Sequence, residues 1–176
     1  MKKTLIAIIT TIGLLFAGYA SLFMYTVTKQ DAESLLVCAD TDDVFIIPFA
    51  KNICRAYLFT LRGTQQDIDF LHGGIGASSV VQGESSVAKR EQILKFLISK
   101  GLDVNRIDMH QLTPLHGAVL ANSVDEVEIL LRNGASPNLK DKKFGLTPLE
   151  LALKLDRENK LPEDRRAVIS LLRNAK

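Results

Sequence analysis

The sequence contains no tryptophan, and aromatic residues make up only 6% of its 176 positions. Proteins that hold single-stranded nucleic acid use aromatic side chains on which the bases stack, and this chain offers few of them. An excess of charge of one sign is also missing, because 22 Lys and Arg residues are balanced by 20 Asp and Glu residues, which leaves a net charge of +2. The composition therefore argues against nucleic acid as a partner.

Cysteine and histidine are scarce as well. The two cysteines, Cys38 and Cys54, form no C-x-x-C motif, and the three histidines, His72, His110 and His116, are scattered along the chain. A zinc site is therefore not expected. Catalytic Ser, His and Asp or Cys and His residues do not occur in the setting of a known motif. We expect no cofactor, no small-molecule substrate and no enzymatic activity.

What the chain does have is a long apolar segment. Lys2 and Lys3 are followed by an uncharged run over residues 4–28. The run has about 25 residues and would be about 37 Å long as a helix, against ~30 Å for the hydrocarbon core of a bilayer. A buried core helix of this length without any charge is not expected. Residues 1–28 are therefore predicted to be a signal peptide or a signal-anchor helix.

Two interpretations of this segment remain open. The small residues Gly18 and Ala20 stand where a signal peptidase would cleave. The apolar run continues beyond them to Val27, however, and its length favours an anchor that stays in the membrane. In both cases residues 30–176 are exported, because the positively charged Lys pair stays on the cytoplasmic side.

Both cysteines lie beyond the apolar run, in what is then an oxidising compartment. An even number of cysteines there favours a disulfide between Cys38 and Cys54, which would close a loop of about 16 residues. The alternative is that both thiols are buried as small apolar side chains.

A repeat with a period near 33 residues occupies the second half of the chain. The segment LKFLISKGLDVNRID matches VEILLRNGASPNLKD, and QLTPLHGAV matches GLTPLELAL. Gly101 and Gly134 are 33 positions apart, and Thr113 and Thr147 are 34 apart because one residue is inserted. Proline suits the first position of a helix and glycine suits its end, so each unit predicts a turn followed by two short helices.

This repeat resembles the ankyrin repeat, most clearly in Thr-Pro-Leu-His at 113–116 and Thr-Pro-Leu at 147–149. Thr113 is expected to cap a helix, and His116 to form hydrogen bonds within or between repeats. Glu150 stands in the place of the histidine in the next unit. The resemblance implies structural roles for Thr113, Pro114, Leu115, His116, Gly134, Thr147, Pro148 and Leu149.

The predicted fold is all-α: an ankyrin-repeat stack of about four helical pairs, two of them divergent, behind the apolar signal or anchor helix. Thr64 and Asp67 predict a capped helix start. The stretch 73–86 is rich in Gly and Ser and is expected to be a loop or a degraded first helix. The expected parts are a linker (29–47) and the ankyrin-repeat domain (48–176), which is divided into a divergent capping pair (48–73), a degenerate repeat (74–105), a full repeat (106–140) and a C-terminal capping repeat (141–176).

Stacks of this kind present the tips of their turns and a concave helical face to protein partners. Met109, His110 and Phe144 are unusual residues for purely solvated tips, although Phe144 could instead fold back onto its own repeat. The residues predicted to bind a partner are Asp108, Met109, His110, Gln111, Asp141, Lys142, Lys143 and Phe144.

A small exported ankyrin-like chain without a catalytic motif resembles the bacterial ankyrin-containing immunity proteins. These neutralise toxins that type VI secretion delivers into the periplasm, phospholipase effectors in particular, and the stretch CRAYLFTLRGTQQDIDFLHGG adds to the resemblance. The resemblance implies a cognate lipase effector as protein partner, and a periplasmic location, anchored to the inner membrane or released after cleavage. Two alternatives stay open: a periplasmic ankyrin protein that supports catalase or envelope homeostasis, and a structural envelope scaffold.

Overall fold

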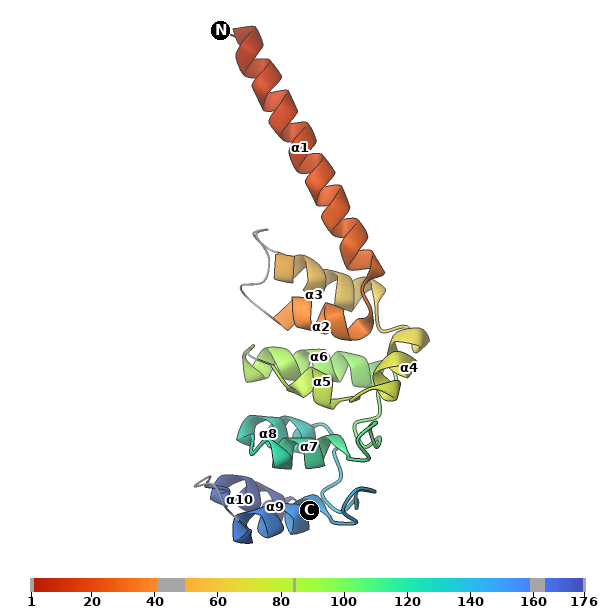
Figure 1. Cartoon of the computed structure of the whole chain (residues 1–176), viewed down its shortest axis with the longest axis vertical. Coiled ribbons are helices and arrows are strands. Elements are labelled where there is room, and N and C mark those ends of the chain that lie inside the picture. Colours follow the sequence, from red (N-terminus) through yellow and green to blue (C-terminus); the bar gives the residue numbers. More distant parts are fainter. Residues whose placement is uncertain (1, 41–49, 84, 159–163, 176) are drawn as a thin grey trace.

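A computed structural model describes residues 2–40, 50–83, 85–158 and 164–175, and every element in these ranges is a helix (Figure 1). The prediction of an all-α stack behind an apolar helix is therefore confirmed. In chain order the helices are α1 (Lys2–Lys29), α2 (Ala32–Asp40), α3 (Ala50–Leu61), α4 (Gln65–Gly73), α5 (Ser78–Val81), α6 (Val87–Ser99), α7 (Pro114–Leu120), α8 (Val124–Arg132), α9 (Pro148–Arg157) and α10 (Arg166–Asn174).

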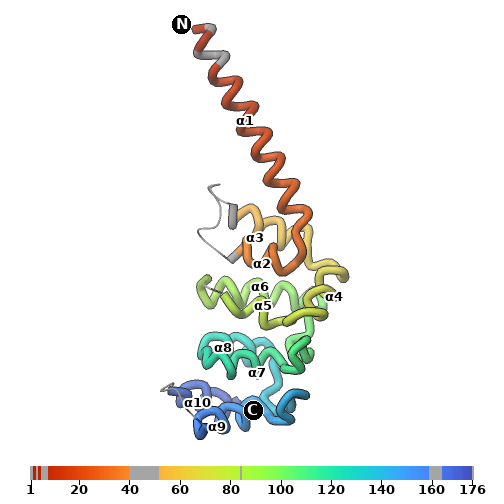
Figure 2. Tube along the Cα trace, in the orientation of Figure 1, coloured from red at the N-terminus to blue at the C-terminus, as the bar shows by residue number. Residues whose placement is uncertain are grey.

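Helix α1 projects from one end of the stack, and the pair α9 and α10 lies at the opposite end (Figures 1 and 2). By length and composition its segment Ile8–Lys29 could cross a membrane, a test that a signal sequence also passes. The side chains of residues 8–22 are exposed, whereas Phe23 and Val27 are 8% and 3% exposed and belong to the core. The last two turns of α1 are thus part of the folded stack.

Helices α2 and α3 pack against each other as the first pair of the stack. Leu35 on α2 and Leu58 on α3 are buried in the core. A disulfide between Cys38 and Cys54 also joins the two helices, with Cα atoms 5.9 Å apart, a usual span for such a bond.

Two expected boundaries differ from the structure. The expected linker, 29–47, contains helix α2, because Leu35, Leu36 and Ala39 recur at helical spacing and are buried. The pair expected over 48–73 is wrong in its partners, because α3 packs on α2, while α4 is an additional helix that also contacts α2. The rest of the expected linker and the start of the expected pair lie outside the described residues.

Three further pairs complete the described stack: α5 with α6, α7 with α8, and α9 with α10. The Gly- and Ser-rich stretch 73–86 contains the one-turn helix α5, whose Val80 and Val81 are buried. This pair therefore has a shortened first helix. Apolar side chains from all four pairs form a continuous core, in which Leu130 of α8 is fully buried.

The ends of the helices largely follow the sequence signals. Thr64 and Asp67 form a capping box at the start of α4, and Pro114 is the first residue of α7. Gly134 has a φ of +91°, the left-handed conformation that ends a helix with least strain. The cap predicted for Thr113 is wrong in its chemistry, because the Thr113 side chain contacts the His116 ring and not a backbone N–H.

Arginine side chains tie successive parts of the stack together. Arg90 of α6 donates to the carbonyl of Val81, at the end of α5. Arg165, directly before α10, donates to the carbonyl of Val119 in α7 over 2.8 Å. Carbonyls in the last turn of a helix lack partners in that helix, so a buried guanidinium satisfies them while it joins two helices.

Candidate functional site

The first predicted tip is a tight turn between α6 and α7 that Asp108 organises. Its carboxylate accepts hydrogen bonds from the backbone N–H of His110 (2.8 Å) and of Leu112 (2.9 Å). The Asp108 N–H also donates to the Leu112 carbonyl over 2.8 Å. Gln111 has a φ of +65°, which reverses the chain, and the side chains of Met109 and His110 are left exposed.

The second tip, between α8 and α9, has the same design with one more residue. The Asp141 carboxylate accepts a hydrogen bond from the Phe144 N–H, and the Asp141 N–H donates to the Leu146 carbonyl over 3.0 Å. Lys142, Lys143 and Phe144 are exposed on this turn.

Backbone hydrogen bonds hold neighbouring turns together. The Lys142 N–H donates to the Gln111 carbonyl over 3.0 Å, and the Met109 N–H donates to the Gly74 carbonyl over 3.3 Å. The two tips are therefore fixed side by side, next to the loop that follows α4. We call their exposed residues the tip ridge: Met109, His110, Gln111, Lys142, Lys143 and Phe144.

Two large apolar side chains are exposed on the tip ridge. Met109 is 67% exposed and Phe144 is 41% exposed. The Lys143 ammonium lies 5.5 Å from the centre of the Phe144 ring, within the range of a cation–π contact. Phe144 is therefore not buried within its own repeat, and its ring is available to a partner.

His116 lies beneath the ridge and is fully buried. Its Nδ1 is 2.7 Å from the Thr113 hydroxyl, and its Nε2 is 2.9 Å from the Leu146 carbonyl. The carbonyl can only accept, so in the neutral ring Nε2 carries the hydrogen and Nδ1 accepts from Thr113. Burial lowers the pKa of His116 below its ordinary value, which favours this neutral form. The imidazole thus joins α7 to the turn before α9, a structural role.

Asp141 is not available to a partner. Its side chain is buried, with one carboxylate oxygen 3.3 Å from Nε2 of His116 and the other engaged by Phe144. Its prediction as a binding residue is therefore wrong: the carboxylate shapes the turn and faces inward. Asp108 is half-buried for the same reason, because it accepts the hydrogen bonds that close its own turn.

The remaining repeat residues occupy structural positions. Leu115 and Pro148 are buried, and Leu149 is half-buried against the core. Thr147 caps α9 together with Glu150, whose carboxylate accepts from the Thr147 N–H over 2.8 Å. In this unit a capping box formed by Thr147 and Glu150 therefore stands where the preceding unit has the hydrogen bonds of His116.

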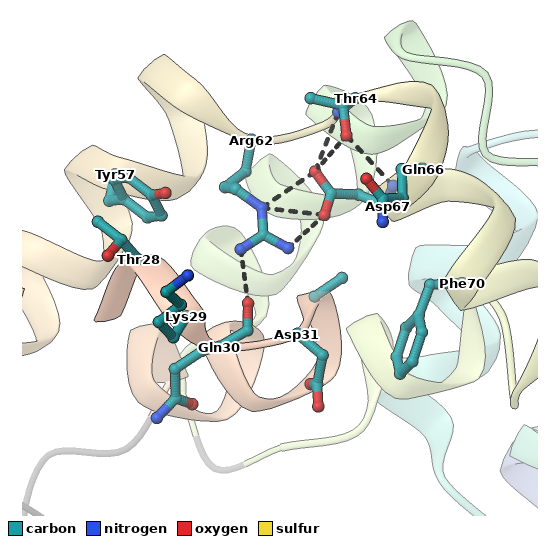
Figure 3. Close-up of a pocket in the computed structure, with 11 residues that line it drawn as sticks. Thr28, Lys29, Gln30, Asp31, Tyr57, Arg62, Thr64, Gln66, Asp67 and Phe70 are labelled. Atoms are coloured by element: carbon teal, nitrogen blue, oxygen red, sulfur yellow. Dashed lines mark hydrogen bonds and ion pairs between the residues drawn. The ribbon is translucent and has the colours of Figure 1, made fainter. Parts of the chain in front are cut away.

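A pocket of about 480 Å³ opens elsewhere, where α1 ends beside α3 and α4 (Figure 3). Arg62 crosses it: the guanidinium donates to both oxygens of the Asp67 carboxylate and to the Gln30 carbonyl (2.8 Å). Burial would raise the pKa of Asp67, but hydrogen bonds from Arg62 and Thr64 hold it below its ordinary value. Arg62 therefore joins the residue that follows α1 to the start of α4.

Sequence reasoning identifies Thr64 and Asp67 only as a helix cap and misses this clamp. Arg62 and Gln30 are 32 positions apart, and the guanidinium binds a backbone carbonyl, which any residue type would provide. A lone arginine before a capping box carries no signal for such a contact. The pocket is likewise assembled from segments that no local pattern connects.

Among the described residues, no three His, Cys, Asp or Glu side chains gather as a metal site would require. The apolar helix α1 and the disulfide together indicate secretion or membrane anchoring.

Comparison with known proteins locates the repeats. A family model described as "Ankyrin repeats (many copies)" matches residues 97–152. The chain is 41% identical over 80 residues to 2-5A-dependent ribonuclease of Mus musculus, covering 42% of this chain and 11% of that protein. It is 36% identical over 63 residues to the ADP-ribosylation factor GTPase-activating protein AGD2 of Arabidopsis thaliana, covering 36% and 8%. It is 44% identical over 59 residues to palmitoyltransferase ZDHHC13 of Homo sapiens, covering 33% and 9%.

The chain thus spans only about a tenth of the length of these relatives, and what it shares with them is the repeats. Their activities differ from one another by name, so the similarity concerns the scaffold. Residues 97–152 hold the second half of one unit, the tip and helices of the next, and the Thr-Pro-Leu start of a third. The chain therefore carries ankyrin repeats.

Proposed function

We propose that this chain is a membrane-anchored protein-binding module that holds its partner on the tip ridge, outside the cytoplasm. The observation that carries the proposal is the exposure of Met109 and Phe144 on two turns that backbone hydrogen bonds fix side by side. Because hydrogen bonds already order the backbone of both turns, a partner that binds there does not have to order it, and the exposed apolar side chains can serve as binding anchors.

Charge around the ridge points to the character of the partner. Lys142 and Lys143 lie on the ridge, and Arg106 and Lys140 are exposed on the adjoining loops, where Asp103 is the exposed carboxylate beside Arg106. Asp141 is buried and Asp108 half-buried, so their charges are less accessible than these cations. A partner that offers an apolar cleft bordered by carboxylates would complement this surface.

We further propose that the partner is a toxin delivered into the periplasm, specifically a lipase effector of type VI secretion, and that the chain is its immunity protein. The resemblance to exported ankyrin immunity proteins motivates this identity. An apolar export helix and a disulfide suit a protein that acts where such a toxin would attack. In this proposal the stack inhibits by covering the lipase cleft and performs no catalysis itself.

A protection assay tests the immunity proposal. Cells that produce a periplasmic type VI lipase should lyse, and co-production of the full chain should restore growth if the two are cognate. Met109→Ala and Phe144→Ala, combined, should abolish the protection, whereas Val124→Ala, an exposed apolar change on α8, should not. Protection that survives the double ridge variant would place the interface elsewhere.

Site-specific photocrosslinking tests the binding surface even while the partner is unidentified. A photoreactive residue at position 109 or 144 should capture one protein outside the cytoplasm, and the same residue at the exposed position 95 on α6 should not. Capture of a catalase instead of a lipase would favour the homeostasis alternative. Equal, diffuse capture from all three positions would contradict a defined ridge interface.

A further inference from the structure

The pocket of about 480 Å³ beside Arg62 lies where helix α1 meets the stack (Figure 3). The uncharged run 4–28 would be about 37 Å long as a helix. A bilayer has a hydrocarbon core of ~30 Å and measures about 40–45 Å with its headgroups. Because Phe23 and Val27 are buried in the stack, the membrane-facing part of the run ends near Leu22, and Lys29 lies seven residues, about 10 Å, farther along the helix. Lys29 and the pocket that it lines therefore lie at the outer edge of the headgroup layer.

The lining of the pocket is mostly polar and includes two aromatic side chains, Tyr57 and Phe70. Thr28, Tyr57 and Thr64 contribute hydroxyl groups, and Phe70 is 48% exposed on the side away from Tyr57 (Figure 3). A volume of this size is in the range of small-ligand sites. An amphipathic lining suits a ligand that has both polar and apolar parts.

Four charged residues line the pocket, and two of them neutralise each other. The guanidinium of Arg62 is held by the Asp67 carboxylate, so this pair adds little net charge. Lys29 and Asp31 remain. Within the described part of the chain the Lys29 ammonium lies 5.9 Å from the centre of the Tyr25 ring and forms no ion pair with a described carboxylate.

The Asp31 carboxylate caps the start of α2 and remains negatively charged while it does so. One carboxylate oxygen accepts a hydrogen bond from the Ser34 N–H over 2.7 Å at the start of α2. This hydrogen bond is the main reason that the pKa of Asp31 is below its ordinary value, and the carboxylate is therefore charged at neutral pH. The pocket thus offers one cation and one anion, both solvent-exposed, at the outer edge of the headgroup layer.

We propose that this pocket binds the headgroup of phosphatidylethanolamine from the membrane that α1 enters, with the phosphate at Lys29 and the primary ammonium at Asp31. Phosphatidylcholine carries the same charges, but its quaternary ammonium has no N–H to donate to the carboxylate. Phosphatidylglycerol has the phosphate without the ammonium. The inference rests on the proposed membrane anchoring of α1, and it adds a lipid that sets the orientation of the stack.

Native mass spectrometry of the detergent-solubilised full chain, titrated with each of the three lipids, tests the proposal. We expect phosphatidylethanolamine to be retained about tenfold more tightly than the other two. Asp31→Asn should bring this preference to within about twofold, and because Asn is also a good N-cap, the start of α2 is preserved. Lys29→Gln should weaken both zwitterionic lipids, whereas Lys95→Gln on α6 serves as the control and should change nothing.

A tryptophan reporter places the lipid, since the chain has no tryptophan of its own. In nanodiscs, the emission of a Phe70→Trp variant should shift when phosphatidylethanolamine replaces phosphatidylcholine. The emission of a Phe144→Trp variant, at the other end of the stack, should not shift. A shift at both positions, or at neither, would place the lipid outside this pocket.

The failures of the two proposals differ. If α1 does not anchor the chain, the protein will be absent from the membrane fraction, and the anchoring proposal fails. If the chain is anchored but binds the three lipids equally, or if Asp31→Asn keeps the preference, the headgroup site is overturned alone. A preference for phosphatidylglycerol would also overturn the headgroup site, because an anionic lipid would then bind through the charge of Lys29 alone, and Asp31 would have no role.

Discussion

At the scale of single residues, the buried His116 ring shows how the stability of a repeat depends on the protonation state of one histidine. Its hydrogen bonds to Thr113 and Leu146 require the neutral ring, and burial keeps its pKa below the ordinary value of 6.5. His72 behaves similarly: its Nε2 accepts from the Asp103 N–H over 3.0 Å, and desolvation lowers its pKa. In the unfolded chain both rings bind protons more readily than in the folded chain.

This difference predicts that acid destabilises the protein. As the pH falls below about 6.5, the unfolded state takes up more protons than the native state, so the free energy of unfolding should decrease. The decrease should be present between about pH 7.5 and 5.5 in urea titrations. His116→Gln should lower stability at all pH values and also reduce this slope, whereas Leu130→Ala should lower stability and keep the slope. A wild-type slope of zero across this interval would contradict the assignment of neutral rings.

Residues that look alike in the sequence separate in the structure. Met109 and Asp141 are both predicted tip residues, yet Met109 is exposed and Asp141 is buried beneath the same ridge. The difference arises because the Asp141 carboxylate is bound by the Phe144 N–H and approached by His116, contacts that depend on the folded turn. Local sequence therefore predicts that a tip exists, but it does not predict which side chains face a partner.

At the scale of helices, the sequence predicts those helices whose start, end or apolar stripe is marked within a short stretch of residues. Helices α7 to α9 begin at Thr-Pro or end at Gly, and α8 to α10 carry an apolar stripe, so repeated local signals predict their positions. Helix α2 is only nine residues long and has no proline or repeat match to mark it. Its stability comes from packing on α3 and from the disulfide, which are contacts between distant segments.

The disulfide between α2 and α3 gives a prediction about this first pair. Cys38 and Cys54 are 16 positions apart, for which the chain-entropy model gives about 3 kcal/mol of stabilisation. Thiol labelling of the exported chain, denatured without reduction, should therefore modify neither cysteine. Reduction should lower the free energy of unfolding by about that amount. Full labelling of both cysteines before reduction would show that packing alone holds α2 to α3.

The tip ridge and the helix core should respond differently to truncation. Leu130→Ala removes a fully buried side chain and should cost about 2–5 kcal/mol of stability through the cavity that it leaves. Met109→Ala should change stability by less than about 0.5 kcal/mol, because the side chain is largely exposed. Phe144→Ala should also cost little stability. Both ridge changes should nevertheless weaken the affinity for the partner that photocrosslinking identifies, by about 2 kcal/mol where the side chain is a central anchor.

Thermal unfolding and affinity for the partner, both measured for each variant, distinguish a loss of binding from a loss of folding. If the ridge variants bind normally, and changes in α3 or α4 abolish binding without unfolding the stack, the interface lies at the N-terminal end. The repeats would then serve as a scaffold for that end.

At the scale of the whole molecule, the membrane segment and the folded stack overlap within α1. The stretch 8–22 is exposed to solvent or to a membrane, whereas Phe23 and Val27 enter the core. A cleavage after Ala20 would leave both residues on the mature chain, and an uncleaved anchor would place them at the membrane surface. The folded domain therefore begins before residue 28 in either interpretation, and the expected boundary at residue 28 is corrected.

This overlap predicts how truncated chains behave. A chain of residues 21–176 should be more stable than one of residues 30–176 by roughly 3–6 kcal/mol, because burying Phe23 and Val27 contributes about 1.5–3 kcal/mol each. That is a large share of the roughly 5–15 kcal/mol typical of a domain, so the shorter chain should unfold at a much lower urea concentration. Both chains retain Gln30 and hence the clamp to Arg62, so the loss of this clamp does not contribute to the difference.

Single substitutions in the longer chain provide the matched control for this experiment. Phe23→Ala in residues 21–176 should cost about 3–5 kcal/mol as a core truncation, whereas Leu22→Ala, one position earlier and exposed, should cost less than about 0.5 kcal/mol. Equal urea midpoints for the two truncated chains, or equal costs for the two substitutions, would mean that α1 only tethers the stack. A rigid connection would then be absent, and the pocket beside Arg62 would not be held at a fixed depth. The outcome therefore also decides whether the membrane can orient the tip ridge toward a partner.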